Sequence, residues 1–244
     1  MEPRLKPQVM EEARMLIDLN ADLGEGITDD AGLLELITSA NVACGFHAGD
    51  LETMRRVCEQ AASRGVVVGA QVSYLDREGF GRRQMDVDFR VLTDWVGQQV
   101  GLLTEVARQA GTVVAYVKPH GALYNRVVSD GRQAAAVLTG SAGLPVMGLP
   151  GSVILEQARA SERAICSEGF PDRGYTRQGT LIPRGEPGDL VSDVMSIADN
   201  AVSLARSGQV GSVCVHGDSP YAVDAARAVR AALEEAGFEL MSWR

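Results

Sequence analysis

The most informative residues for chemistry are a lysine and a histidine two positions apart, Lys118 and His120, in the segment 118–125 (Lys-Pro-His-Gly-Ala-Leu-Tyr-Asn). Only two of the 23 basic residues are lysines, so arginine supplies almost all of the positive charge. A lysine can lose its proton, and its ammonium is a compact point charge. The pair therefore indicates acid–base or charge-stabilising chemistry. The alternative is that Lys118 ends a strand and its amine reaches water or a structural ion pair.

Further polar motifs occur where other short apolar segments end. All three histidines, His47, His120 and His216, lie in such positions. Because the carboxyl ends of the strands of a β/α barrel form one mouth, we expect these side chains to share a site. The other polar residues that follow predicted strands are Asn20, Asp22, Glu25, Asp50, Gln71, Arg82, Arg83, Glu168, Asp172, Arg173 and Asp218.

Several of these residues also fit a purely structural role. Asp50 and Asp218 stand where the N-caps of the following helices belong. Arg82 and Arg83 fit a solvated turn, although the glycines that flank them allow close approach of a ligand, and an arginine fork suits a carboxylate or phosphate. A lone histidine is usually structural, but three of three at strand ends is harder to explain in that way.

Carboxylate and imidazole side chains from separate strands could also bind a metal ion at an open catalytic site. The candidate ligands are Asp22, His47, His120 and His216, and their spacing specifies no particular metal. Neither a Gly-x-x-x-x-Gly-Lys-Ser/Thr nor a Gly-x-Gly-x-x-Gly motif is present, so any nucleotide would be held differently or by a partner. The Gly-x-Ser-x-Gly motif of serine hydrolases is also absent.

The composition predicts a cytoplasmic protein with a substantial core. The 244 residues carry a formal charge of −9, which argues against nucleic-acid and anionic-membrane partners but leaves room for a small acidic or neutral substrate. Four cysteines without close spacing indicate reduced core thiols. No segment has the length and apolarity of a membrane span, and the first residues lack the apolar stretch of a signal peptide.

Strands and helices alternate along the chain, which predicts a closed or nearly closed β/α barrel rather than an open doubly wound sheet. The strand segments read as apolar on both faces, as a parallel sheet covered by helices requires. Helical spacing of apolar residues is clear in segments such as 51–61 and 89–107. We expect residues 1–14 to be a poorly ordered arm and residues 15–244 to form one domain. The predicted strands are 16–19, 41–43, 66–68, 113–117, 145–149, 164–166 and 212–215.

At its polar motifs the chain strongly resembles the LamB/YcsF family, whose members form the A subunit of the bacterial ATP-dependent 5-oxoprolinase. The resemblance implies a distorted seven-stranded (β/α) barrel of the type found in sugar deacetylases. It also implies that 5-oxo-L-proline is opened to L-glutamate with hydrolysis of ATP, together with two further subunits. The match runs from residue 17 to near residue 237 and is carried by segments 18–26, 39–50, 79–83, 118–125, 172–175, 179–184 and 215–218.

The resemblance also suggests roles for individual residues. Asp22 or His120 would activate water, Lys118 with Arg82 or Arg83 would hold the substrate, and replacement of Lys118 by Met would abolish turnover in a folded protein. The catalytic set would be Asp22, His47, Lys118, His120 and His216. The substrate-binding set would be Asn20, Glu25, Asp50, Gln71, Arg82, Arg83, Tyr124, Asn125, Asp172, Arg173 and Asp218.

The chain departs from the family pattern at Gln71-Val72, where a histidine and a proline are usual. Glutamine can hydrogen-bond a substrate, but it cannot titrate near neutral pH or readily replace imidazole on a metal. Two alternatives therefore stay open beside the ATP-dependent lactamase. One is a metal-dependent, deacetylase-like amidohydrolase, and the other is a catalytically weakened binding or regulatory homologue.

Overall fold

Seven parallel strands close into a ring in the computed structural model, which describes residues 15–27, 29–217 and 219–244. Each strand pairs with the next along the chain, and β1 pairs with both β2 and β7 to complete the barrel. A short eighth strand, β8 (Phe238–Leu240), pairs with the start of β1. The barrel strands are β1 (Met15–Leu23), β2 (Ser39–Ala43), β3 (Val67–Val72), β4 (Val114–Pro119), β5 (Val146–Gly148), β6 (Ile165–Gly169) and β7 (Ser212–Val215).

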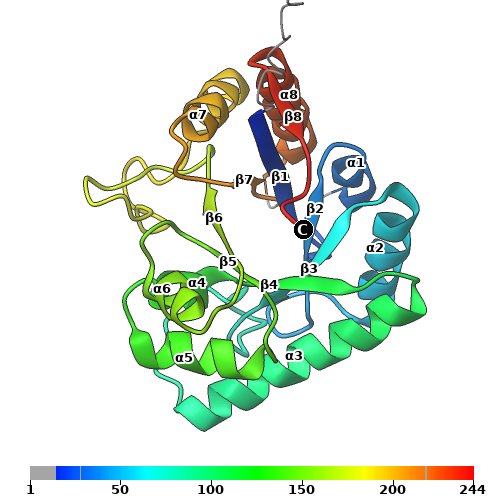
Figure 1. Cartoon of the computed structure of the whole chain (residues 1–244), viewed down its shortest axis with the longest axis vertical. Coiled ribbons are helices and arrows are strands. Elements are labelled where there is room, and N and C mark those ends of the chain that lie inside the picture. The colour runs from blue at the N-terminus through cyan, green and yellow to red at the C-terminus, as the bar shows by residue number, and fades with distance from the viewer. Residues whose placement is uncertain (1–14, 28, 218) are drawn as a thin grey trace, which may run out of the picture.

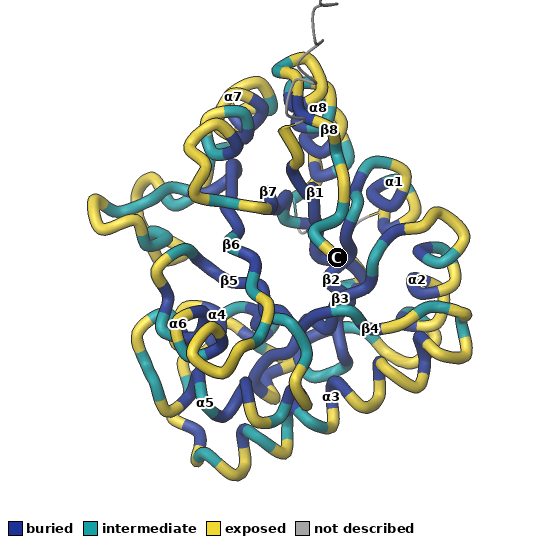
Figure 2. The backbone as a smooth tube through the Cα atoms, viewed as in Figure 1, coloured by how far each residue is buried: buried dark blue, intermediate teal, exposed yellow. Residues whose placement is uncertain are grey.

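Helices surround the ring of strands (Figure 1) and turn their buried sides toward it (Figure 2). In α2, for example, the Asp50 carboxylate caps the Thr53 amide, and the residues spaced three and four apart from Met54 to Ala61 are buried. The helices are α1 (Asp30–Leu34), α2 (Leu51–Arg64), α3 (Phe89–Gln109), α4 (Gly121–Arg126), α5 (Gly131–Gly140), α6 (Val153–Ala160), α7 (Val194–Arg206) and α8 (Ala222–Glu235). In the part of the chain described here, no helix combines the length and apolarity needed to cross a membrane.

The barrel interior is polar, which corrects the expectation of strands that are apolar on both faces. Side chains alternate along a strand, so Asp18, Asn20 and Asp22 of β1 share one face. They contact Ser212 of the neighbouring strand β7 and Lys118 of the more distant strand β4, so this face points inward. The intervening apolar residues of β1 pack in the main hydrophobic core.

The seven predicted strands are all present, but β1 continues through Leu23 instead of ending at residue 19. Asn20 and Asp22 therefore lie within the strand. Their side chains hydrogen-bond to other side chains inside the barrel, so they do not need water as a partner. Sequence reasoning did not predict β8. The predicted N-terminal arm, residues 1–14, lies outside the described residues.

Candidate functional site

The centre of the site is the buried ammonium of Lys118, which enters the barrel from the end of β4. Its Nζ lies 2.8 Å from Glu168 Oε2 and 3.3 Å from Asp22 Oδ1, and the side chain is 2% exposed. Nζ also lies 3.3 Å from Asn20 Oδ1 and 3.2 Å from Cys214 Sγ. One lysine is thus held by two carboxylates that come from different parts of the ring.

These charges set the protonation states around Lys118. Burial alone would lower the pKa of Lys118, but the charge of Asp22, with that of Glu168, outweighs burial and raises it well above its usual value. Burial alone would raise the pKa of Asp22, but the charges of Lys118 and His216 outweigh it and lower the pKa. Burial raises the pKa of Glu168, and the Lys118 charge opposes this effect. Lys118 and Asp22 therefore form an ion pair at neutral pH.

A carboxylate–imidazole pair lies on the β7 side of the site. Asp172 Oδ2 is 2.9 Å from Nδ1 of His216 and 3.1 Å from its backbone nitrogen, which donates to it. The ring stacks on Phe170 with centroids 5.0 Å apart. Burial alone would lower the pKa of His216, but the charge of Asp172 outweighs burial and raises it. Asp172 thus orients the imidazole and favours its protonated form.

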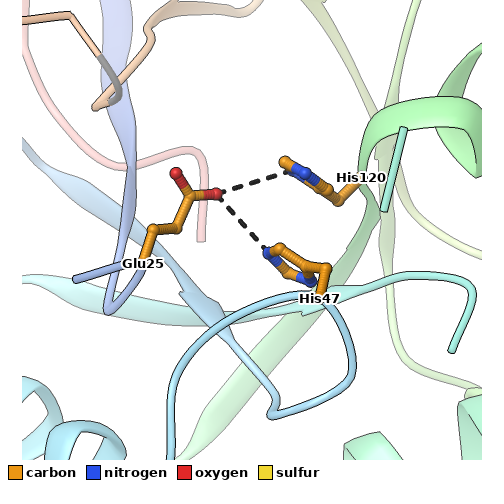
Figure 3. Close-up of side chains that lie close together, drawn as sticks. All are labelled: Glu25, His47 and His120. Atoms are coloured by element: carbon orange, nitrogen blue, oxygen red, sulfur yellow. Dashed lines mark ion pairs between the residues drawn. The ribbon is translucent and has the colours of Figure 1, made fainter. Parts of the chain in front are cut away.

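The other two histidines form a second cluster (Figure 3). The rings of His47 and His120 are stacked with centroids 3.9 Å apart. Glu25 Oε1 lies 3.5 Å from His47 Nε2 and 3.6 Å from His120 Nδ1. The Gln71 amide nitrogen donates to Glu25 Oε1 at 3.0 Å and lies 2.9 Å from His120 Nδ1. Among the described residues, Glu25, His47 and His120 bring three potential metal-ligand atoms within 4.8 Å of one another.

Burial, followed by the neighbouring His47, lowers the pKa of His120 well below its usual value, so its ring is neutral. Its Nε2 lies 3.1 Å from the Phe80 carbonyl oxygen, which can only accept, and this assigns the proton to Nε2. Nδ1 then accepts from Gln71. Both ring nitrogens of His120 are engaged, so this residue is poorly placed to take a proton from water.

A cavity of about 420 Å³ opens beside Lys118, and the charged side chains around it are mostly cationic. Asp22 is the single acid among the described residues that line it, although the whole chain carries a charge of −9. An anionic small molecule would therefore be favoured locally. The cations that line the cavity are Arg82, Lys118, Arg126, Arg173 and Arg184.

Most of the residues predicted for the site meet at or next to this cavity. Arg173 lines it, but its guanidinium donates to the backbone carbonyls of Ile182 and Asp189 and so braces the loop after β6. Asn20 lies beneath Lys118, and Asp172 acts through His216. The residues predicted for the site that line the cavity are Asp22, Arg82, Lys118, His120, Tyr124, Asn125, Arg173 and His216.

Two predicted substrate contacts, Asp50 and Arg83, are exposed and lie outside both the cavity lining and the buried polar clusters. Asp50 is exposed and caps α2, which is the structural role that the sequence offered as the alternative to substrate binding. The Arg83 side chain is 62% exposed and lies 3.5 Å from Asp76 and 3.4 Å from Glu78. Asp218 is outside the described residues.

Sequence reasoning missed several residues that build the site. The sequence places Glu168 after a strand but assigns it no role, although it is the nearest carboxylate partner of Lys118. Asn41 donates to Asp22 Oδ1 at 2.9 Å, and Tyr116 donates to Asn41 at 2.7 Å. The alternation of polar and apolar residues along the strands was the sequence signal that could have identified these residues. Arg126 and Arg184 carried no such signal, because only the fold brings them to the cavity.

The closed ring with its site at the carboxyl ends of the strands defines a deacetylase-like (β/α) barrel. The catalytic domain of a peptidoglycan N-acetylglucosamine deacetylase from Eubacterium rectale has the same fold, with a TM-score of 0.56, 14% identity, and coverage of 98% of this chain and 93% of that one. At that identity the likeness concerns the fold alone.

Closer relatives identify the family. The model of the LamB/YcsF family matches residues 17–244, and the chain belongs to this family. It is 54% identical over 249 residues to the A subunit of 5-oxoprolinase from Streptomyces avermitilis, covering 93% of this chain and 100% of the relative. The corresponding protein of Mycobacterium avium is 47% identical, with 93% and 98% covered. The crystal structure of a lactam utilization protein from Thermus thermophilus matches with a TM-score of 0.87 and 36% identity, covering 94% of this chain and all of that one.

Proposed function

We propose that this chain is the lactam-binding subunit of an ATP-dependent 5-oxoprolinase, which opens 5-oxo-L-proline to L-glutamate. The observation that carries the proposal is that Asp22, Lys118 and His216 lie around one cavity whose other charged side chains are cationic. His216 is held there by its contact with Asp172. Relatives that match over nearly their whole length bear the name of a 5-oxoprolinase component, which supports this substrate.

The substrate carries one carboxylate and one lactam carbonyl, and the cavity offers separate partners for them. Arg82 lines the cavity whereas Arg83 does not, so Arg82 is the better candidate for the substrate carboxylate. Lys118 would stabilise negative charge on the carbonyl oxygen or on a phosphoryl group attached to it. The buried Tyr124 also lines the cavity.

Asp22 is a better candidate than His120 for activating water. Lys118 and Asn41 both donate to Asp22 Oδ1, while Oδ2 lies 4.0 Å from His120 Nδ1. Protonated His216 would give its proton to the lactam nitrogen as the C–N bond breaks. ATP would supply a phosphoryl group to the carbonyl oxygen and leave as ADP, which makes the carbon a better electrophile. Addition of water and cleavage of the C–N bond would leave an acyl phosphate, and a second water would hydrolyse it to the carboxylate and inorganic phosphate.

Assembly with two further subunits would account for the absence of a nucleotide-binding motif from a chain whose reaction consumes ATP. Its relatives are named as one subunit of a larger enzyme, which supports such a complex. The four cysteines are all unpaired and buried, which fits a protein that acts in the reducing cytoplasm.

The test is 5-oxoproline-dependent release of phosphate and glutamate by the chain alone and by its mixture with the two partner subunits. Turnover in the mixture is expected. No turnover with partners that are active beside another family member would contradict the proposal. Hydrolysis without ATP would instead favour the amidohydrolase, for which the Glu25, His47 and His120 cluster is the supporting observation. Binding of 5-oxoproline without turnover would favour the weakened homologue.

Asp22→Asn is the sharpest variant for the chemical step. The expected result is a fall in kcat of roughly 10²- to 10⁴-fold with little change in KM, because a general base is lost while the shape is kept. Lys118→Met is less informative. It would leave Asp22 and Glu168 buried without their counter-ion, so the structure argues against the expectation that this variant folds normally.

Asp193→Asn is the matched control, because Asp193 only caps α7 and asparagine caps a helix about as well. Asp193→Asn should match the wild-type protein in thermal unfolding, and Asp22→Asn should remain folded because Lys118 keeps Glu168 as its counter-ion. Full turnover by folded Asp22→Asn would remove Asp22 from the mechanism.

A further inference from the structure

The hydrogen bonds around the two stacked histidines fix which ring nitrogens carry protons. The Ser73 hydroxyl donates to the Tyr74 carbonyl at 2.9 Å, so its oxygen is left to accept from His47 Nδ1 at 3.0 Å. The Phe80 carbonyl accepts from His120 Nε2. In both rings the proton is therefore on the side facing away from Glu25.

This arrangement leaves two imidazole lone pairs directed at one carboxylate oxygen. His47 Nε2 is fully buried, has no hydrogen-bond partner, and lies 3.5 Å from Glu25 Oε1. His120 Nδ1 lies 3.6 Å from the same oxygen. The Gln71 amide nitrogen bridges two of these three electron-pair donors, Glu25 Oε1 and His120 Nδ1, and leaves His47 Nε2 without a partner. A cation held among the three atoms would satisfy all of them at once.

We propose that Glu25, His47 and His120 bind one divalent first-row transition-metal ion. Two imidazoles with one carboxylate are ligands that zinc, iron and cobalt accept, and three protein ligands leave a coordination position open. The second shell is also in place, because metal-binding histidines usually donate their other N–H to an oxygen, as both do here. Asp22 is not one of the three ligands, in contrast to its place among the sequence-based candidates. This inference concerns binding and does not rest on the proposed reaction.

Gln71 would regulate the affinity of this site. Its amide nitrogen donates to Glu25 and His120, while its Oε1 is buried without a partner. A bound ion competes with these donors. A half-turn of the amide would remove the competition and direct Oε1 toward the ion. Gln71→Glu removes the competing N–H group and adds a negative charge, so it should tighten binding by roughly tenfold or more.

The test uses the full chain, stripped with a chelator and titrated with Co²⁺ while visible absorption is followed, then with Zn²⁺ in competition. We expect one ion per chain with a nitrogen- and oxygen-ligated Co²⁺ spectrum. Glu25→Gln and His47→Asn should lose stoichiometric binding. Ser73→Ala should weaken it by roughly 10- to 100-fold, because only the second shell changes.

His216→Asn is the matched control, since this histidine faces Asp172 rather than Glu25, and its Co²⁺ affinity should equal that of the wild-type chain. Circular dichroism of each variant separates loss of a ligand from loss of the fold. Absence of stoichiometric binding by the folded wild-type chain would overturn the proposal. So would wild-type affinity in folded Glu25→Gln and His47→Asn, or weaker binding by Gln71→Glu.

Discussion

At the scale of single residues, the barrel interior concentrates carboxylates around very little positive charge. Asp18 lies deepest along β1, where the hydroxyls of Thr38, Ser39 and Ser212 donate to it. Burial is the largest effect on Asp18 and raises its pKa from 3.8 to about 6, although the three hydroxyls oppose it. This carboxyl therefore binds a proton more tightly in the folded chain than in the unfolded one.

The sign of the resulting pH dependence follows from that difference. The contribution of Asp18 to the free energy of unfolding is fully present below its unfolded pKa of 3.8 and is lost as the pH rises through about 6. The loss amounts to about 3 kcal/mol, since one pKa unit corresponds to about 1.4 kcal/mol. Asp18→Asn should lack this change. Urea unfolding at about pH 4.5 and pH 7 should capture about 2 kcal/mol of it, because part is already lost at pH 4.5. Equal pH dependence in both proteins would contradict the assigned shift.

Residue types alone were enough to predict part of the site. The rarity of lysine and the position of each histidine pointed to Lys118, His120 and His216, which meet at the cavity. Glu168 could not be found in this way, because an isolated glutamate after a strand resembles any surface acid. Its importance comes from lying 2.8 Å from Lys118 inside the barrel, which is a property of ring closure and not of local sequence.

At the scale of elements, the strands and most helices could be predicted because apolar spacing controls them locally. The end of β1 could not, since a strand that satisfies its polar residues inside a barrel resembles a loop in sequence. The β3–β4 pair gives another example. The register shifts between Val68 and Gly69, and the ring of Tyr116 lies against Gly69.

Gly69→Ala tests that packing. An added Cβ would lie 2.2 Å from the Tyr116 ring, which is fully buried and tied to Asn41. We expect a loss of about 1–3 kcal/mol in the free energy of unfolding, because an overpacked interior must shift. Gly101→Ala is the control. Gly101 lies in the middle of α3, and an added Cβ there would have no neighbouring heavy atom within 4 Å. The substitution should therefore stabilise the chain by about 0.5–1 kcal/mol. Equal urea midpoints for the two variants would contradict this account.

At the scale of the whole molecule, the two ends of the barrel have different tasks. The carboxyl ends of the strands carry the cavity and the histidine cluster. The opposite end is closed by the C-terminal residues, which follow β8 back over the ring of strands (Figure 1). Ser242 Oγ lies 3.1 Å from Ser39 Oγ at the start of β2, and the Trp243 ring packs on Tyr116 with centroids 5.3 Å apart. The tail thus covers the polar interior at the end away from the cavity.

Trp243→Ala tests this division between stability and binding. Removing a fully buried tryptophan costs about 3–5 kcal/mol, so for this half-buried ring we expect a loss of about 2 kcal/mol in the free energy of unfolding. The KM for 5-oxoproline in the assembled enzyme should stay unchanged, because Trp243 is not among the residues that line the cavity. Arg244→Ala, which removes only a cation lying 4.5 Å from the Trp243 ring centroid, should cost less than about 1 kcal/mol. A changed KM with unchanged stability in Trp243→Ala would show instead that the closed end of the barrel communicates with the cavity, through the chain of Tyr116, Asn41 and Asp22.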